Sequence, residues 1–162
     1  MSSSSFSSSS STTEAKLLTL KTSDGKTFLL NEAAVTKFGF VKQLVDDGCD
    51  SGVIFIPQAD SRIMSTMLEW CKKHTDEAAT SDELEAWDAE FVKDMDQGFL
   101  YHLLLAADYL NGTELVNLLA QKVANMIKGK KAEEIRQIFH IKNDFTPEQE
   151  EEIRRKNPWA FC

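Results

Sequence analysis

The sequence lacks the signals that direct a chain into a membrane or onto nucleic acid. It has no apolar run of the roughly 18 residues that a membrane-spanning helix needs, and its N-terminus has no basic region followed by an apolar segment. Its 18 Lys and Arg are outnumbered by 26 Asp and Glu, which gives a formal net charge of -8. Phosphate backbones and anionic lipid surfaces repel such a chain. We therefore expect no nucleic acid and no membrane among its partners.

Cysteine is also scarce, and its pattern bears on the compartment. The three residues, Cys49, Cys71 and Cys162, are odd in number, far apart in sequence and in no CxxC pair. This pattern is typical of reduced thiols in an intracellular protein. We expect the protein in the nucleus and the cytoplasm.

Catalytic motifs are missing as well. The chain contains no GxSxG, GxGxxG or P-loop sequence, and none of His74, His102 and His140 begins an HExxH motif or has a metal ligand at a suitable spacing. We therefore expect no metal, no cofactor and no enzymatic activity. The rival hypothesis is a small enzyme that uses Cys71 or His102.

What the sequence does contain is one helix of almost uniformly apolar character, residues 96–110 (DQGFLYHLLLAADYL). Successive helical residues are about 100° apart, so Leu103, Leu104 and Leu105 point in three directions. A helix that is apolar all round is a buried one, and Asp96 is a suitable N-cap. We predict a central helix with other elements packed on every side.

Before this helix the pattern predicts a small sheet with helices. Residues 1–14 form a serine tract that we expect to be disordered. Two alternating runs around Asp24-Gly25 predict a hairpin, and the β-branched run at residues 53–56 predicts a third strand that pairs with it. A helix should open at Asp60 or Ser61, and the acidic residues 75–86 should form a flexible loop.

After the central helix the chain carries more apolar surface than a thin helical lobe can bury. The helix predicted from Thr113 to Ile127 is apolar over about half its circumference, and a second amphipathic helix follows at residues 131–139. Thr146, Pro147 and Gln149 predict the start of a third. Trp159 lies beyond its end, with no core sequence left to bury it, so it is either frayed or an anchor in an interface. We predict a docking surface for a protein partner here.

Six segments of the chain form a distinctive set: WDAEF (87–91), DQGFL (96–100), LLLAADYL (103–110), VANMIKGK (123–130), EEIRQIF (133–139) and IKNDFTPEQEEEIRRKN (141–157). Together they resemble the S-phase kinase-associated, or Skp-type, adaptors of cullin ubiquitin ligases, in particular the plant ones. The likeness covers residues 17–161 and leaves out only the serine tract.

The resemblance implies an α+β fold of the BTB/POZ class over residues 15–128, extended by F-box-binding helices over residues 129–162. It also implies that Asp108 and Tyr109 contact the N-terminal domain of a cullin. The positions that fall in the family's F-box-binding region are Leu100, Tyr101, Leu104, Leu115, Leu119, Val123, Ile127, Ile135, Ile138, Phe139, Ile141, Phe145, Ile153 and Trp159.

The implied function is that of a non-catalytic adaptor that bridges a cullin to an F-box substrate receptor, while ubiquitin transfer is catalysed elsewhere in the assembly. Asp108 motivates an alternative, because the family usually has Asn there and a charge replaces an amide. The alternative is a partner that stabilises F-box proteins and binds cullin weakly or not at all. Tyr101 and Phe99 also depart from the usual residues, and Lys131 removes a usual helix cap.

Overall fold

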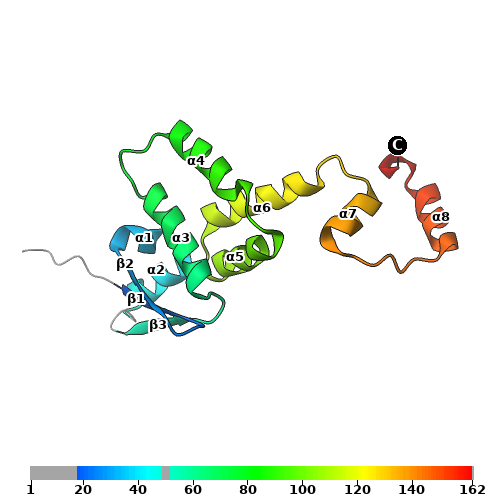
Figure 1. Cartoon of the computed structure of the whole chain (residues 1–162). Helices are drawn as coiled ribbons and strands as arrows, with labels where there is room; N and C mark the ends of the chain where they lie inside the picture. Colours follow the sequence, from blue (N-terminus) through cyan, green and yellow to red (C-terminus); the bar gives the residue numbers. More distant parts are fainter. Residues whose placement is uncertain (1–17, 49–51, 162) are drawn as a thin grey trace, which may run out of the picture. The chain divides into compact units, whose positions relative to one another are not determined.

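The computed structural model describes residues 18–48 and 52–161 of the chain, which divides into two compact units, residues 1–119 and residues 120–162 (Figure 1). The expected disordered tract at residues 1–14 lies outside the described residues, as do Cys49 and Cys162. The division between the units falls inside helix α6 (Thr113–Ile127).

Unit 1 is built on a three-stranded sheet, as predicted. Strands β1 (Leu18–Thr22) and β2 (Thr27–Leu30) form an antiparallel hairpin, and β3 (Val53–Ile56) pairs with β1 in parallel, so the strand order is β2-β1-β3. The hairpin turn uses Gly25 at a positive φ of 83°. Side chains alternate across β1, where Leu18 and Leu20 are buried and Lys21 is exposed.

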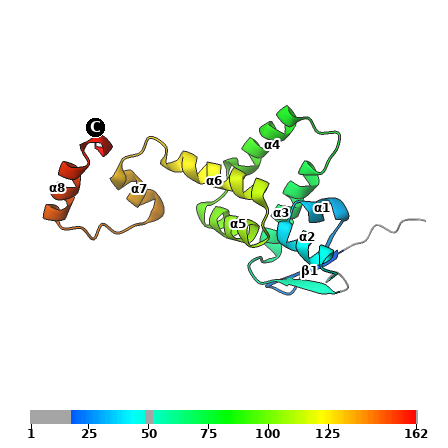
Figure 2. The same cartoon turned by 180° about the vertical axis from the view of Figure 1, so that it is seen from behind.

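The helices of unit 1 gather on one face of this sheet (Figures 1 and 2). They are α1 (Glu32–Thr36), α2 (Gly39–Asp46), α3 (Ser61–His74), α4 (Ser81–Lys93) and α5 (Gln97–Tyr109). The predicted start of α3 at Asp60 or Ser61 is confirmed, and the Asp60 carboxylate caps the helix by accepting a hydrogen bond from the backbone N–H of Ile63 at 2.8 Å. Helix α3 buries a continuous stripe of side chains, namely Ile63, Met64, Met67, Trp70 and Cys71.

The prediction of a flexible acidic loop at residues 75–86 is wrong for its second half, because α4 begins at Ser81. A capping box explains the helix: the Thr80 hydroxyl accepts from the Glu83 N–H, and the Glu83 carboxylate accepts from the Thr80 N–H at 3.0 Å. Further along α4, Asp88 Oδ1 lies 2.8 Å from His74 Nε2 and 3.2 Å from Trp70 Nε1. These contacts fasten α4 onto α3.

Helix α5 forms where expected, with the Asp96 carboxylate accepting from the Phe99 N–H at 3.2 Å. One face is buried through Leu100, Leu103, Ala106 and Ala107. The prediction that it is buried on every side is wrong, because Leu105 on the opposite face is 62% exposed. Because the helix is apolar on all sides, the periodicity of its sequence does not distinguish the exposed face from the buried one.

Unit 2 contains the end of α6, then α7 (Ala132–Phe139), α8 (Pro147–Lys156) and the 3-10 turn η1 (Pro158–Ala160). The predicted start of α8 is confirmed, with Thr146 and Gln149 forming a capping box and Pro147 at the first position. At the start of α7 Lys131 has no side-chain acceptor to cap the helix, but its N–H donates to Glu134 Oε2 at 2.8 Å and its carbonyl accepts from the Ile135 N–H at 3.0 Å. No side chain of residues 120–161 is buried.

Candidate functional site

The first candidate surface lies on unit 2. We call it the C-terminal apolar surface, and it comprises Ile135, Ile138, Phe139, Ile141, Phe145, Ile153, Trp159 and Phe161. The three residues of α7 and Ile153 of α8 are half-buried, whereas the other four side chains are exposed. Trp159 is 79% exposed. Large apolar side chains gathered in this way mark a protein interaction surface.

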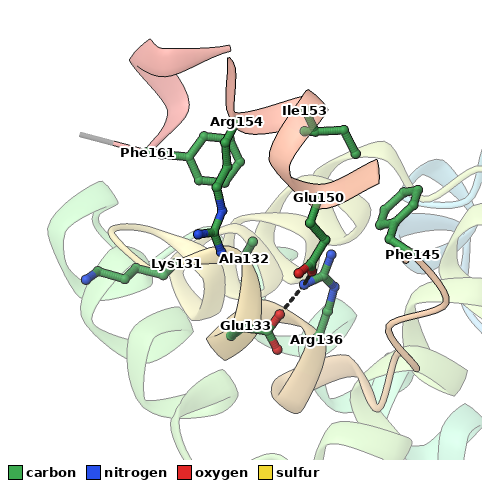
Figure 3. Close-up of a pocket in the computed structure, with 9 residues that line it drawn as sticks. All are labelled: Lys131, Ala132, Glu133, Arg136, Phe145, Glu150, Ile153, Arg154 and Phe161. Atoms are coloured by element: carbon green, nitrogen blue, oxygen red, sulfur yellow. Dashed lines mark hydrogen bonds and ion pairs between the residues drawn. The ribbon is translucent and has the colours of Figure 1, made fainter. Parts of the chain in front are cut away.

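The same surface is hollowed between α7 and α8 (Figure 3). The hollow, of about 310 Å³, brings together residues far apart in the unit: Lys131 and Ala132 at the start of α7, Phe145 before α8, Ile153 on α8 and Phe161 at the end. Aromatic and aliphatic side chains thus line a cavity large enough for a bulky apolar side chain of a partner.

Charged side chains surround the hollow and are arranged unequally. Arg136 forms ion pairs with Glu133, on its own helix, and with Glu150 of α8, whose Oε1 lies 3.7 Å from Arg136 Nη1. Asn143 Nδ2 donates to the same Oε1 at 2.5 Å. The Arg154 guanidinium instead lies 5.8 Å from the centre of the Phe161 ring. Arg136 therefore joins α7 to α8, while Arg154 supports the aromatic wall.

The second candidate surface lies on unit 1, along the open face of α5. We call it the α5 stripe, and it comprises His102, Leu105, Asp108 and Tyr109, all of them exposed. The positions 102, 105 and 109 follow the i, i+3, i+7 spacing of one helical face. The stripe offers aliphatic, aromatic and charged groups together, which suits a protein partner.

The end of α5 is held by the start of α2, and this contact brings an aromatic neighbour to Tyr109. The N–H groups of Gly39 and Phe40 donate to the carbonyls of Asn111 and Leu110, each at 3.1 Å. Asn111 has a positive φ of 54°, which Asn tolerates better than most residues. The Phe40 ring consequently lies 5.4 Å from the Tyr109 ring.

The structure distributes the predicted site residues over three environments. Leu100, Leu115 and Leu119 are buried in the core of unit 1. Half-buried positions are Tyr101, Leu104, Val123, Ile127, Ile135, Ile138, Phe139 and Ile153, and exposed ones are Ile141, Phe145, Trp159, Asp108 and Tyr109. Only the last two groups present side-chain surface to a partner.

Three residues of these surfaces, His102, Leu105 and Phe161, were missed by the site prediction, as was Phe40, which contacts Tyr109. Phe40 is distant in sequence from Tyr109, and no local pattern indicates their contact. Phe161 follows the last helix, where periodicity gives no information. Leu105 carried a usable signal, because it shares the helical face of His102 and Tyr109.

The two residues of the rival enzyme hypothesis lie in different environments: Cys71 is buried in the core of unit 1, and His102 is exposed on the α5 stripe. Burial raises the pKa of the Cys71 thiol to about 12, so it is un-ionised at neutral pH. Within residues 18–48 and 52–161 no three His, Cys, Asp or Glu side chains converge as metal ligands. No described helix is long and apolar enough to cross a membrane. The exposed apolar and aromatic side chains of both surfaces favour protein contacts.

Comparison with known proteins identifies the family. Residues 16–76 match the family model described as "Skp1 family, tetramerisation domain", and residues 113–160 match "Skp1 family, dimerisation domain". SKP1-like protein 1A of Arabidopsis thaliana is 46% identical over 158 residues, covering 91% of this chain and 98% of that protein. The chain belongs to the Skp1 family. SKP1-like protein 1 of Oryza sativa subsp. japonica is 45% identical over 168 residues, covering 91% of this chain and 96% of that protein.

Membership of the Skp1 family confirms the α+β BTB/POZ fold that the resemblance implied, with a helical C-terminal region. It supports an SCF adaptor role in general and implies F-box proteins and cullins as the kinds of partner. The two matched ranges contain the sheet with α1 to α3 and the run from α6 to η1. Most of the C-terminal apolar surface falls within the second.

Proposed function

We propose that this chain is a non-catalytic adaptor that binds an F-box segment on unit 2 and the N-terminal domain of a cullin on the α5 stripe. Its action is positional, because it holds a substrate receptor and a ligase scaffold in one assembly. The single observation that carries the proposal is the C-terminal apolar surface. None of its side chains is fully buried within unit 2. The nucleus and the cytoplasm, where such ligases act, are the proposed location.

The F-box side rests on the hollow of unit 2. Phe145, Ile153 and Phe161 line it, and Trp159 stands exposed beyond the end of α8. Exposed tryptophans that a partner covers are frequent binding hot spots. An amphipathic helical segment of an F-box has the apolar stripe needed to fill such a hollow.

The cullin side rests on the α5 stripe. Tyr109 is supported by Phe40, so its ring is held in place before any partner arrives. Leu105 adds an apolar contact one helical turn earlier, and Asp108 sets the charge of the surface. A rigid aromatic beside a fixed charge gives a partner both affinity and a preferred orientation.

Two variants, each expected to lose binding of one partner only, test the two sides. Phe145→Asp places a charge in the hollow and should abolish capture by an immobilised F-box segment, while the titration with the cullin N-terminal domain stays unchanged. Leu105→Asp on α5 is the matched control and should have the reverse effect, because Leu105 is exposed as well, 62% against 47% for Phe145. If the wild-type chain fails to bind a full F-box segment, the proposal is wrong.

A second candidate function keeps the F-box partner and omits the cullin, and Asp108 favours it. This carboxylate is exposed on the α5 stripe beside Tyr109, at a position where the family resemblance implies an amide. Titrating the cullin N-terminal domain into wild type and Asp108→Asn separates the two functions. Equal and tight affinities eliminate the second candidate, whereas tight binding by the variant alone supports it.

A further inference from the structure

The outer face of the sheet of unit 1 is unusually apolar. The helices lie on the other face (Figures 1 and 2), and within residues 18–48 and 52–119 no helix covers the outer one. Its three large side chains, Leu29, Val53 and Phe55, are each more than half exposed. A sheet packed on one side normally has polar residues on the other, so these side chains indicate an interaction surface.

The strand register places these side chains in one patch, which we call the outer sheet patch. Thr19 of β1 pairs with Leu29 on one side and with Val53 on the other. Two residues further along β1, Lys21 pairs with Thr27 and with Phe55. The patch therefore consists of two adjacent cross-strand rows with β1 in the middle.

The charge of the patch is concentrated at Lys21. Its side chain is exposed on the central strand, beside Phe55, and has no acidic partner among the described residues. The other polar side chains of the two rows are Thr19 and Thr27, which carry no charge. An unpaired cation among apolar side chains is complementary to a partner that presents a carboxylate within an apolar stripe.

The dimensions of the patch define the shape of the occupant. Neighbouring strands are about 4.8 Å apart, so the outer strands β2 and β3 are separated by roughly 10 Å. This distance is close to the diameter of an α-helix with its side chains, about 10–12 Å. A helix aligned with the strands contacts all three of them.

We propose that the outer sheet patch binds an amphipathic helix of another protein, with a Glu or Asp in its apolar stripe that pairs with Lys21. This third surface is separate from the two surfaces of the proposed function and does not depend on it. A second copy of this chain fits less well, because a two-fold axis through the patch brings the two Lys21 side chains together. An anionic membrane fits less well too, since the chain has a formal net charge of -8.

The test uses two synthetic helical peptides as probes, identical except for a Glu or a Lys at one position of a leucine stripe. Binding to the full chain is measured by titration calorimetry. We expect the Glu peptide to bind wild type about tenfold or more tightly than the Lys peptide. Phe55→Ser should weaken binding of the Glu peptide by about tenfold or more, and Lys21→Glu should make the Lys peptide bind more tightly than the Glu peptide. Circular dichroism confirms that both variants are folded.

Four outcomes overturn the proposal. Equal binding of the two peptides to wild type and to Lys21→Glu excludes the charge pairing. Absence of binding by either peptide excludes a helical partner at this patch. Binding that appears only after deletion of residues 1–17 shows that the N-terminal segment of this chain is the occupant. A concentration-dependent dimer in sedimentation that Phe55→Ser abolishes shows that the occupant is a second copy.

Discussion

The two units of this chain are built from similar helices but bury their side chains very differently. Every buried side chain of the described residues lies between residues 18 and 119. Residues 120–161 have four elements of helical structure in whole or in part and bury none. Burial of apolar surface is the main source of folding free energy, so unit 1 has a core that stabilises it, whereas unit 2 retains apolar surface that its own helices do not bury.

Unit 2 nevertheless forms helices, because their ends are stabilised locally. Helix α8 contains Ile153 as its single half-buried apolar residue, but it begins with a capping box and ends with three basic residues. Such caps and favourable charges at the helix ends stabilise it without a core. The comparison therefore separates formation of a helix from burial of its apolar face.

The largest expected effect is on the core of unit 1. Leu103→Ala removes a fully buried side chain from α5 and should lower the free energy of unfolding by about 2–5 kcal/mol. Leu105→Ala on the open face of the same helix should change it by about 0.5 kcal/mol or less. Denaturant unfolding followed by circular dichroism measures both. Equal losses in the two variants contradict the assignment of one buried and one open face.

The next effect concerns binding by unit 2. Trp159→Ala should leave the free energy of unfolding of the free chain almost unchanged, because the ring is largely exposed. It should weaken the binding of an F-box segment by about 2 kcal/mol or more, roughly thirtyfold in affinity. Titration calorimetry measures the loss. Lys156→Ala, on the exposed side of α8, is the control and should bind within about threefold of wild type. Unchanged affinity of the tryptophan variant shows that this end is frayed rather than an anchor.

Much of unit 1 was predictable from local patterns. Alternating runs around Asp24-Gly25 gave the correct hairpin, and the signal at Asp60 or Ser61 gave the correct start of α3. The open face of α5 was not predicted, because a uniformly apolar helix has no polar side to reveal its orientation. The start of α4 was missed for the opposite reason: an acidic composition outweighed the capping signal of Thr80 and Glu83.

The site was predictable mainly as a region. Surplus apolar surface in the C-terminal third follows from counting residues, and the structure confirms it. Which side chains are accessible depends on tertiary packing, so Leu115 and Leu119 share a helix with Val123 but are buried in unit 1. Contacts between distant segments, such as that of Phe40 with Tyr109, have no local signal at all.

A smaller effect is expected where α4 is fastened to α3. Asp88→Ala leaves Trp70 Nε1 and His74 Nε2 without their shared acceptor and should destabilise unit 1 by about 1–3 kcal/mol. Glu90→Ala, which breaks an exposed pair with Lys93 on the same helix, should cost less than about 0.5 kcal/mol. Thermal unfolding compares the two variants. Equal stability of both means that α4 is held by its apolar contacts alone.

The smallest effect is a pH dependence at the start of α4. Hydrogen bonds from the Thr80 backbone N–H, and then contact with its side chain, lower the pKa of Glu83 below its ordinary value of about 4.3. A lowered folded-state pKa means that the charged cap stabilises the helix fully above pH 4.3 and that this contribution is lost as the pH falls through the folded value.

Glu83→Gln isolates this contribution, because it keeps a capping box of the kind that Gln149 forms in α8 but removes the titrating group. Wild type should be slightly more stable than the variant at pH 6, and the difference should shrink below pH 4 as Glu83 gains its proton. Thermal unfolding at a series of pH values measures that difference. Glu85→Gln, an exposed glutamate of the same helix without a capping contact, serves as the control. If the stability difference between wild type and Glu83→Gln stays constant from pH 6 to pH 3, the charge of Glu83 contributes nothing to the cap. The start of α4 is then stabilised by neutral hydrogen bonds, as the start of α8 is.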